Sequence, residues 1–136
     1  MEKKDLLKDV IKHIDIKSYN STELIDAMRN MSFTSRDTAR AADILMMMCK
    51  EKECTNILTL AGSTSAAGCM QVYVDMVRNK MIDVVVATGA SIIDMDLFEA
   101  LGFKHYIGET ENVIADTTLR DLYIDRIYDT YIDEEE

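Results

Sequence analysis

Cysteine is scarce in this sequence, and the arrangement of the few cysteines excludes two kinds of site. The three residues are Cys49, Cys54 and Cys69. Their spacing matches no metal-binding motif, and their odd number argues against a disulfide framework. Each stands in or beside an apolar helix or strand, so we expect small, buried hydrophobic side chains. Reduced thiols of this kind indicate a cytoplasmic protein.

Long apolar runs and internal repeats are also lacking. No run reaches the roughly 18 residues of a membrane-spanning helix, and the charged start Met1–Asp9 does not resemble a secretory signal peptide. We therefore expect no membrane association and one domain over residues 1–136, which would bury roughly two-thirds of its unfolded surface. Residues 1–18 have a weak amphipathic pattern and are expected to form a short helix or an N-terminal arm.

Positive charge is under-represented as well. Against 25 Asp and Glu residues stand 15 Lys and Arg residues, which gives a formal net charge of −10 at pH 7. A protein that binds nucleic acid neutralises phosphate groups with Lys and Arg. We therefore expect no nucleic acid among the partners.

The residues that are present are organised around the stretch Asn56–Leu101. Ile57–Leu60 is an apolar run with the length of a buried strand. After a loop rich in glycine and serine, a helical spacing of apolar residues begins at Ala66. It places Met70, Val74 and Val77 on one buried face and polar residues such as Asp75 largely elsewhere. Val84–Ala87 is a second strand, apolar on both faces like a covered parallel strand, and a second loop leads into a helix over Asp94–Leu101. This order predicts a right-handed βαβ unit in an α/β fold.

Both loops of this unit leave the carboxyl ends of their strands, where open α/β sheets bind ligands. The first loop brings small side chains, hydroxyl groups and backbone N–H groups to a helix N-terminus, through Gly62, Ser63, Thr64, Ser65 and Gly68. Such a loop suits a phosphate or pyrophosphate. Neither the dinucleotide fingerprint G-x-G-x-x-G nor a P-loop is present. A tight strand-to-helix turn without a ligand explains the same residues equally well.

Two helices are predicted before the central stretch. Asn20 followed by Glu23 is typical of a helix start, and apolar residues continue to Met31. Thr34 opens the next helix, which runs through Met46-Met47-Met48. Methionine adapts to irregular surroundings, so this run indicates core packing or a subunit contact.

A strand and a helix are predicted after the central stretch. Phe103–Gly108 has the pattern of a short strand ending at glycine. His105 within it is either a proton carrier or, since no partner is evident from sequence, a structural residue. The last helix is expected to start at Asp116 or Thr117 and to carry the apolar residues Leu119, Leu122, Tyr123, Ile127 and Tyr131.

Several segments of the sequence carry a resemblance to a known family. They are LTLAGSTSAAG, NKMIDVVVATGASIIDMDLFEALGFKHYIGE and LRDLYIDRIYDTYIDEEE, preceded by HIDIKSYNSTELIDAM and ARAADILMMM. Together they resemble the amino-terminal half of the deoxyhypusine synthase family, and within it the bacterial and archaeal deoxyhypusine synthase-like branch. The resemblance extends from about His13 to Glu136.

This resemblance implies a fold, a cofactor and partners. The implied fold is a Rossmann-like three-layer fold with a parallel sheet, of which this chain is the amino-terminal part, with NAD as cofactor and a tetrameric assembly. Family members move the aminobutyl group of spermidine onto another amine, which in deoxyhypusine synthase is a lysine of a translation factor. The implied partners are therefore spermidine or a related polyamine, that translation factor, and a homo- or hetero-oligomer with another deoxyhypusine synthase-like chain. An acidic chain is compatible with a polyamine substrate.

The resemblance also assigns site residues. The NAD contacts of the family carry over to Gly62, Ser63, Thr64, Ser65 and Ala66 in the first loop and to Thr88, Gly89 and Ala90 in the second. The acidic residue that contacts both NAD and the polyamine aligns with Asp94. The match departs from eukaryotic members at Ser63, where they have asparagine, and at Ile93-Asp94, where they have two adjacent glutamates. Asp94 at the start of a helix is equally well explained as an ordinary cap.

No catalytic residue is assigned to this chain. The family's nucleophile is a lysine that forms a covalent imine with the butyl group, and an amine acts in this way when it is desolvated and deprotonated. In the family this lysine lies in the carboxyl-terminal half, with the histidine, the tryptophan and the acidic residues of the polyamine pocket. None of the lysines here occupies that motif, and the chain has no tryptophan. We therefore expect the chain alone to be inactive.

Three functions remain open from the sequence. The preferred one is the NAD-binding part of a deoxyhypusine synthase-like aminobutyl transferase, whose lysine comes from a second chain or from further sequence. The second is a catalytically dead paralogue that regulates a full-length homologue. The third is a stand-alone nucleotide-binding module. The downstream reading frame would separate the first two, since a continuation with the lysine-containing half supports the transferase.

Overall fold

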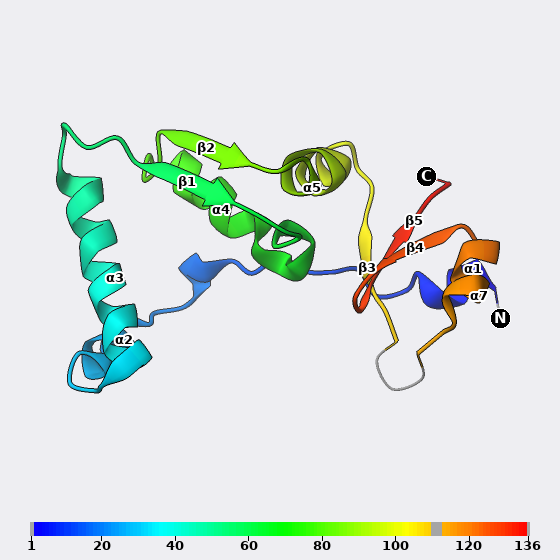
Figure 1. Ribbon diagram of the computed structural model, residues 1–136, viewed down its shortest axis with the longest axis horizontal. Coiled ribbons are helices and arrows are strands. Elements are labelled where there is room, and N and C mark those ends of the chain that lie inside the picture. The colour runs from blue at the N-terminus through cyan, green and yellow to red at the C-terminus, as the bar shows by residue number, and fades with distance from the viewer. Residues whose placement is uncertain (1, 110–112, 136) are drawn as a thin grey trace. The chain divides into compact units, whose positions relative to one another are not determined.

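The computed structural model describes residues 2–109 and 113–135, and Figure 1 traces their order along the chain. Their contacts gather into two compact units. The first unit comprises residues 2–14, 60–70, 87–109 and 113–135, and the second comprises residues 15–59 and 71–86. The single domain expected over residues 1–136 stays a prediction.

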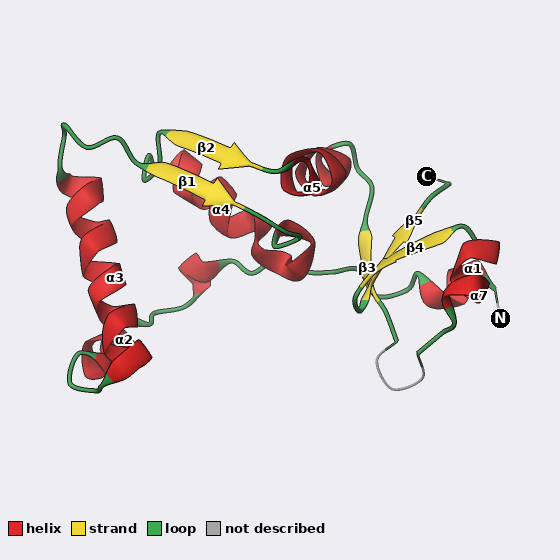
Figure 2. Ribbon diagram, in the orientation of Figure 1, coloured by secondary structure: helices red, strands yellow, loops and turns green. Residues whose placement is uncertain are grey.

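The second unit carries the early helices and most of the central stretch. Its elements are η1 (Ile16–Ser18), α2 (Thr22–Met28), α3 (Phe33–Lys50), β1 (Ile57–Leu60), α4 (Met70–Arg78) and β2 (Val84–Ala87), as Figure 2 shows. The backbone N–H of Thr22 donates a hydrogen bond of 3.0 Å to the side-chain oxygen of Asn20. This bond satisfies a free donor at the start of α2, as expected for Asn20. Both predicted helix starts are confirmed to within two residues.

Strands β1 and β2 form a small parallel sheet and are connected by α4 (Figure 1). Their bounds agree with the sequence prediction at all four ends. Where β2 begins, the carbonyl oxygen of Asn56 accepts hydrogen bonds from the backbone N–H groups of Asp83 and Val84, at 2.8 and 3.2 Å. The Asp83 carboxylate in turn accepts a bond of 2.8 Å from the Asn56 N–H. These bonds fix the register of the two strands.

The sequence predicted a sheet covered on both faces. The described residues leave part of it exposed. Val84, Val85 and Val86 are 42, 40 and 55 % exposed, and Ile57 is exposed as well. Parallel strands with apolar residues on both faces are normally covered on both sides. The exposed valines therefore form an apolar surface of the kind that marks an interface.

Helix α4 buries a charged residue that the sequence pattern placed on its polar face. Asp75 is 4 % exposed, whereas Val77, which was expected in the core, is exposed. The Lys17 ammonium of η1 donates a hydrogen bond of 2.7 Å to the Asp75 Oδ1. This bond lowers the pKa of Asp75 below its ordinary value of 3.8 and raises the pKa of Lys17. The prediction was wrong because the partner lies 58 residues away in sequence, beyond any local pattern.

Replacing Asp75 by Asn should make the second unit less sensitive to acid. A carboxyl group with a lowered folded-state pKa contributes stability above its unfolded-state pKa and loses it as the pH falls through the folded-state value. The unmodified chain should therefore lose more stability than Asp75→Asn from about pH 5 downward, in urea unfolding followed by circular dichroism. Asp37→Asn removes an exposed carboxylate that pairs with Arg40 at 3.7 Å and is the control. Equal slopes for Asp75→Asn and the unmodified chain would contradict the assignment.

The first unit contains both predicted loops and a second sheet. Its elements are α1 (Lys3–Leu6), η2 (Ser65–Cys69), α5 (Gly89–Ser91), η3 (Ile92–Leu97), α6 (Phe98–Ala100), β3 (His105–Ile107), α7 (Asp116–Asp121), β4 (Ile124–Ile127) and β5 (Thr130–Asp133). The strands form an antiparallel sheet in the order β3-β5-β4. The described chain is therefore mixed α/β, with one small parallel and one antiparallel sheet, and the Rossmann-like three-layer fold stays a prediction.

The core of the first unit lies between this sheet and the short helices. Its buried residues are Leu6 of α1, Leu119 of α7, Ile124 of β4 and Tyr131 of β5. Gly108 approaches the hairpin so closely that an added Cβ would lie 2.9 Å from both the carbonyl oxygen of Asp129 and the Tyr131 ring. Only a residue without a side chain fits at this position.

The N-terminal segment pairs with β3. The Ile11 N–H donates a hydrogen bond of 2.8 Å to the His105 carbonyl, and the Ile107 N–H donates one of 2.7 Å to the Asp9 carbonyl. Together with the burial of Leu6, these bonds attach residues 3–14 to the first unit. This segment is thus a short helix followed by an extended arm.

The predicted last helix is wrong beyond Asp121. Helix α7 ends there, Tyr123 has φ 55°, and β4 and β5 follow. The apolar residues three and four positions apart were interpreted as a helical face. In the structure Leu119 lies in α7, whereas Ile127 lies in β4 and Tyr131 in β5. The burial of Ile124 and Tyr131 against α1 and α7 decides the outcome.

The cysteines and methionines follow the sequence expectations only in part. All three cysteines are free, Cys54 and Cys69 are half-buried, and Cys49 is exposed, so the expected burial is wrong for Cys49. Met46 and Met47 of α3 are exposed, which leaves them available for a subunit contact. Within the described ranges, no helix combines the length and the apolar character needed to cross a bilayer.

Candidate functional site

The first predicted loop follows β1 and lies in the first unit. Gly62 has φ 74°, a left-handed conformation that glycine adopts without steric cost. An added Cβ there would find no atom within 4 Å, so the loop is open on this side. Ser63 and Thr64 are half-buried, whereas Ser65 and Ala66 are buried. The loop therefore presents one open edge and one packed edge.

Gly68 interrupts the helix that the sequence predicted from Ala66. It has φ 95°, and an added Cβ would lie 3.2 Å from the carbonyl oxygen of Lys12. Its own carbonyl accepts a hydrogen bond of 2.9 Å from the Ile14 N–H. Because α4 begins only at Met70, the dipole of a long helix does not start at this loop. An anion in the loop would depend on its backbone N–H groups and hydroxyls instead.

The second predicted loop leads directly into a helical run. Thr88 and Gly89 are exposed and Ala90 is half-buried. Elements α5, η3 and α6 follow one another without a gap from Gly89 to Ala100, and Thr88 is the N-cap residue. Asp94 is exposed and lies inside this run, so its interpretation as a cap is wrong.

Two hydrogen bonds join the loops. The Ser91 hydroxyl donates a bond of 2.7 Å to the carbonyl oxygen of Gly62. The Thr88 N–H donates one of 3.3 Å to the carbonyl oxygen of Leu60. Ser91 is fully buried, so water does not compete for the first bond. The structure thus brings together the two loops that the sequence predicted to share a site.

Two buried oxygen atoms beside the loops have no hydrogen-bond partner among the described residues, namely Ser65 Oγ and Asp96 Oδ1. Leaving a buried polar atom unpaired costs about 1–3 kcal/mol. Ser65 is in the first loop and Asp96 is in η3, which contacts η2. An unsatisfied hydroxyl in a loop otherwise closed by hydrogen bonds fits a polar ligand group. Sequence reasoning missed Asp96, because no local pattern separates it from Asp94.

A cluster of two histidines and one glutamate lies in the same unit. Glu99 of α6 is bound through one oxygen to His13 Nε2 at 2.5 Å and through the other to His105 Nδ1 at 2.7 Å. His105 is fully buried, and Glu99 and His13 are largely so. An ionised carboxylate only accepts hydrogen bonds, so the two facing imidazole nitrogens are then the donors. His105 therefore has a partner that sequence reasoning did not find.

This cluster connects the surroundings of the two loops. His13 precedes Ile14, whose N–H binds the Gly68 carbonyl after the first loop. Glu99 belongs to the helical run that starts at the second loop. Glu99 is thus a positioning residue, since its two hydrogen bonds hold the N-terminal segment, α6 and β3 together. The sequence could not indicate the contact between His13 and Glu99, because these residues are 86 positions apart.

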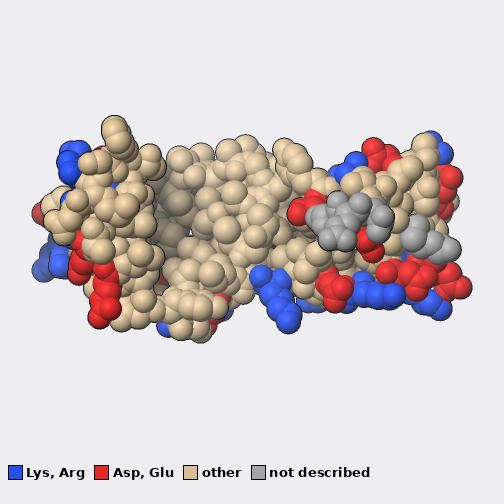
Figure 3. Space-filling view, turned by 90° about the horizontal axis from the view of Figure 1, so that it is seen from below, with Lys and Arg blue, Asp and Glu red and all other residues tan. Residues whose placement is uncertain are grey.

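On the face that Figure 3 shows, the charged side chains of the first unit do not form a binding patch of one sign. In Figure 3, acidic and basic side chains are mixed on the part of the surface near the grey residues. Within residues 2–109 and 113–135, no group of three His, Cys, Asp or Glu side chains is arranged to hold a metal ion.

The chain is similar to known proteins over almost its whole length. The family model described as deoxyhypusine synthase matches residues 23–136. A deoxyhypusine synthase-like protein of Caulobacter vibrioides is 64 % identical over 135 residues, which are 99 % of this chain and 36 % of the relative. Similar proteins of Coxiella burnetii and Chlorobaculum tepidum are 58 and 53 % identical, over 98 and 100 % of this chain and 38 % of each relative. The chain thus spans little more than a third of the length of these relatives.

Proposed function

The chain belongs to the deoxyhypusine synthase family, and from this premise we propose that it forms the NAD-binding part of an aminobutyl transferase that acts on spermidine. The observation that carries the proposal is the pairing of the two loops through Ser91 and Gly62. It supports the proposal that the first loop, with Gly62, Ser63, Thr64, Ser65 and Ala66, and the second loop, with Thr88, Gly89 and Ala90, share one site.

The residues present fit a dinucleotide. The Ser65 hydroxyl lacks a partner among the described residues and is available to a phosphate oxygen. The open space at Gly62 and at Gly89 lets a ligand approach the backbone. Asp94 is exposed inside the helical run that starts at Gly89 and is proposed to contact both cofactor and polyamine. NAD, when bound, supplies the capacity to accept a hydride from the substrate.

We propose that the parallel pair of β1 and β2 belongs to a larger Rossmann-like three-layer fold. The valines of β2 are exposed, whereas parallel sheets almost always have both faces covered by other elements. The cover would come from further polypeptide or from another subunit. The exposed Met46 and Met47 of α3 are proposed to lie in such a contact.

The proposal is tested by calorimetric titration of the chain with NAD. We expect a dissociation constant on the order of 1 mM. Ser63→Arg should abolish binding, because its side chain fills the space assigned to the phosphate. Ser65→Ala should weaken binding about threefold to tenfold, since one neutral hydrogen bond contributes about 1 kcal/mol.

Thr117→Arg is the matched control for Ser63→Arg. It adds the same charge at an exposed position of α7 in the same unit, away from both loops. It should bind NAD like the unmodified chain. Unchanged binding by Ser63→Arg would place the cofactor elsewhere and would refute the assignment of the first loop.

A further inference from the structure

Helix α3 carries a row of exposed residues at the spacing of a coiled-coil seam. Its members follow one another at alternating steps of four and three residues and are Phe33, Asp37, Arg40, Ile44 and Met47. At 3.6 residues per turn, this spacing confines them to a sector of about 80° on one side of the helix. Phe33, Ile44 and Met47 are 90, 51 and 61 % exposed. The α3 row therefore combines three uncovered apolar side chains with an acidic and a basic residue at its middle.

The other elements of the second unit leave the α3 row free. Helix α2 contacts α3, and Arg29 at the end of α2 forms an ion pair with Asp43. Ala39 is fully buried. Asp43 and Ala39 lie about 80–120° around the helix from the middle of the α3 row. Helix α2 therefore packs beside the row and does not cover it.

The two charged residues of the α3 row form an exposed ion pair within the helix. Arg40 Nη1 lies 3.7 Å from Asp37 Oδ1, and the two side chains are 72 and 69 % exposed. Exposed pairs of this kind hold their side chains only weakly. Both residues can therefore turn toward charges on another molecule.

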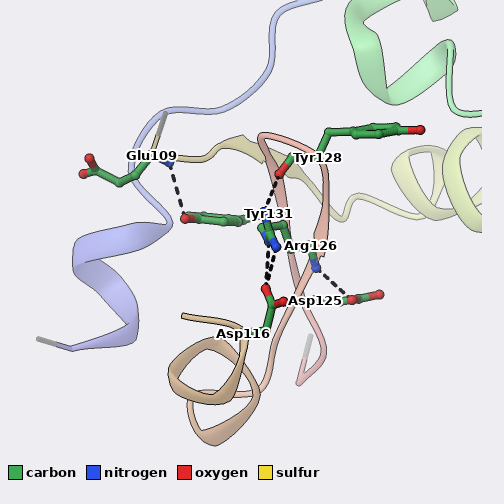
Figure 4. A network of polar contacts seen from close by, with 6 residues as sticks. All are labelled: Glu109, Asp116, Asp125, Arg126, Tyr128 and Tyr131. Carbon is green, nitrogen blue, oxygen red and sulfur yellow. Dashed lines mark hydrogen bonds and ion pairs between the residues drawn. The ribbon is translucent and has the colours of Figure 1, made fainter. Parts of the chain in front are cut away.

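The exposed turn between β4 and β5 of the first unit offers no comparable pattern. Tyr128 is 88 % exposed. The neighbouring Arg126 donates hydrogen bonds of 3.0 and 2.6 Å to Asp116 Oδ1 and one of 3.2 Å to the Tyr128 carbonyl (Figure 4). The charge of Arg126 is thus matched within the chain, and one exposed ring does not define a partner. The α3 row, in contrast, presents charges of both signs in a fixed order.

We propose that the α3 row is the contact between two copies of this chain, whose α3 helices lie antiparallel. A two-fold axis at the middle of the row places Asp37 of each copy opposite Arg40 of the other. The same axis places Phe33 of each copy opposite Ile44 of the other. The row is thus complementary to itself, as an interface between two identical subunits requires.

Charge complementarity decides both the orientation and the occupant. Parallel α3 helices in register would place Asp37 opposite Asp37 and Arg40 opposite Arg40, and like charges in contact are unfavourable. An apolar partner segment would leave both residues without an opposite charge. An antiparallel second copy pairs both charges and covers the apolar ends of the row. Neither NAD nor a polyamine takes part in this contact, which lies in the second unit.

The test is sedimentation velocity of the chain at low ionic strength, where exposed charges are least screened, over a range of concentrations. One helix from each copy makes a small interface, so we expect a dimer with a dissociation constant on the order of 10 μM. Asp37→Arg and Arg40→Asp should each weaken association at least about tenfold, because two attractive pairs become repulsive.

The pairing can be restored in two ways. An equimolar mixture of Asp37→Arg and Arg40→Asp should form a heterodimer as tightly as the unmodified chain dimerises, because each charge again faces its opposite. The double variant with both substitutions should also dimerise, because it exchanges the two charges of every pair. A variant that had merely lost its fold would not be rescued by mixing.

Lys52→Asp is the matched control for Arg40→Asp. Lys52 is exposed in the second unit beyond the end of α3, and its replacement changes the charge by the same amount. This variant should associate like the unmodified chain. Circular dichroism of all variants should show the same helix content, since the replaced side chains are exposed.

Three results would overturn the proposal. The first is an unmodified chain that stays monomeric at every concentration. The second is association of both charge-reversed variants like the unmodified chain, which would place the contact elsewhere, for example on the exposed valines of β2. The third is a mixture and a double variant that remain monomeric. Titration with NAD tests the proposed function independently, so either proposal can fail while the other stands.

Discussion

Incubated with spermidine, NAD and an acceptor amine, this chain alone is expected to transfer no aminobutyl group. A nucleophilic lysine must be desolvated and deprotonated. Lys17 is hydrogen-bonded to Asp75, and this bond raises its pKa, which keeps the ammonium protonated. Lys3 forms ion pairs with Asp133 and Glu135. Neither lysine is therefore prepared for attack on the butyl group.

The measurement is mass spectrometry of the acceptor and of the chain after treatment with borohydride. We expect no added aminobutyl group and no trapped adduct on any lysine. The relative from Caulobacter vibrioides, which is nearly three times as long as the aligned segment, is assayed in parallel for comparison. An adduct on a lysine of this chain would refute the argument, whatever the yield.

Replacing Glu99 by Ala should lower the free energy of unfolding by about 3 kcal/mol, because two buried imidazoles lose their shared partner. Urea unfolding followed by circular dichroism gives this value. Glu99→Gln should lose less, since its carbonyl oxygen still accepts one of the two bonds. If Glu99→Ala unfolds like the unmodified chain, the cluster does not hold the first unit together.

Asp121→Ala is the control for Glu99→Ala. Asp121 is exposed on α7 and pairs with its neighbour Arg120 at 2.8 Å. Exposed ion pairs contribute little, so this variant should stay within about 0.5 kcal/mol of the unmodified chain. A similar loss in both variants would mean that removal of any carboxylate destabilises this acidic chain.

The elements that the sequence predicted well are those whose signal is local. The bounds of β1 and β2 follow from short apolar runs between loops, and the Asn20 side chain accepts a hydrogen bond from Thr22, two positions away, at the start of α2. The pairing of the two loops was predictable in outline, because consecutive parallel strands place their carboxyl ends at one edge of a sheet. The particular hydrogen bond between Ser91 and Gly62 that joins the loops was not predictable from the sequence.

The features that sequence reasoning missed depend on distant partners. Asp75 looks like a surface residue of α4 until Lys17 is brought against it. The residues of β4 and β5 fit a helical spacing as well as a strand, and contact with Leu6 decides between the two. The first unit also contains a cavity of about 370 Å³ that is lined by residues from Ile11 to Thr130, so no local motif could have indicated it.

The pairing of the N-terminal arm with β3 has a consequence for biosynthesis. Ile11 leaves the ribosome before its partner His105 exists, since the two are separated by more than 90 residues of chain. At a synthesis rate of roughly 5–20 residues per second, the arm remains without its partner for about 5–20 s. The β4–β5 hairpin, in contrast, can close within about 1–10 μs of release because its strands are adjacent. The arm is therefore accessible to chaperones and proteases until β3 has emerged, whereas the hairpin closes as soon as its two strands are released.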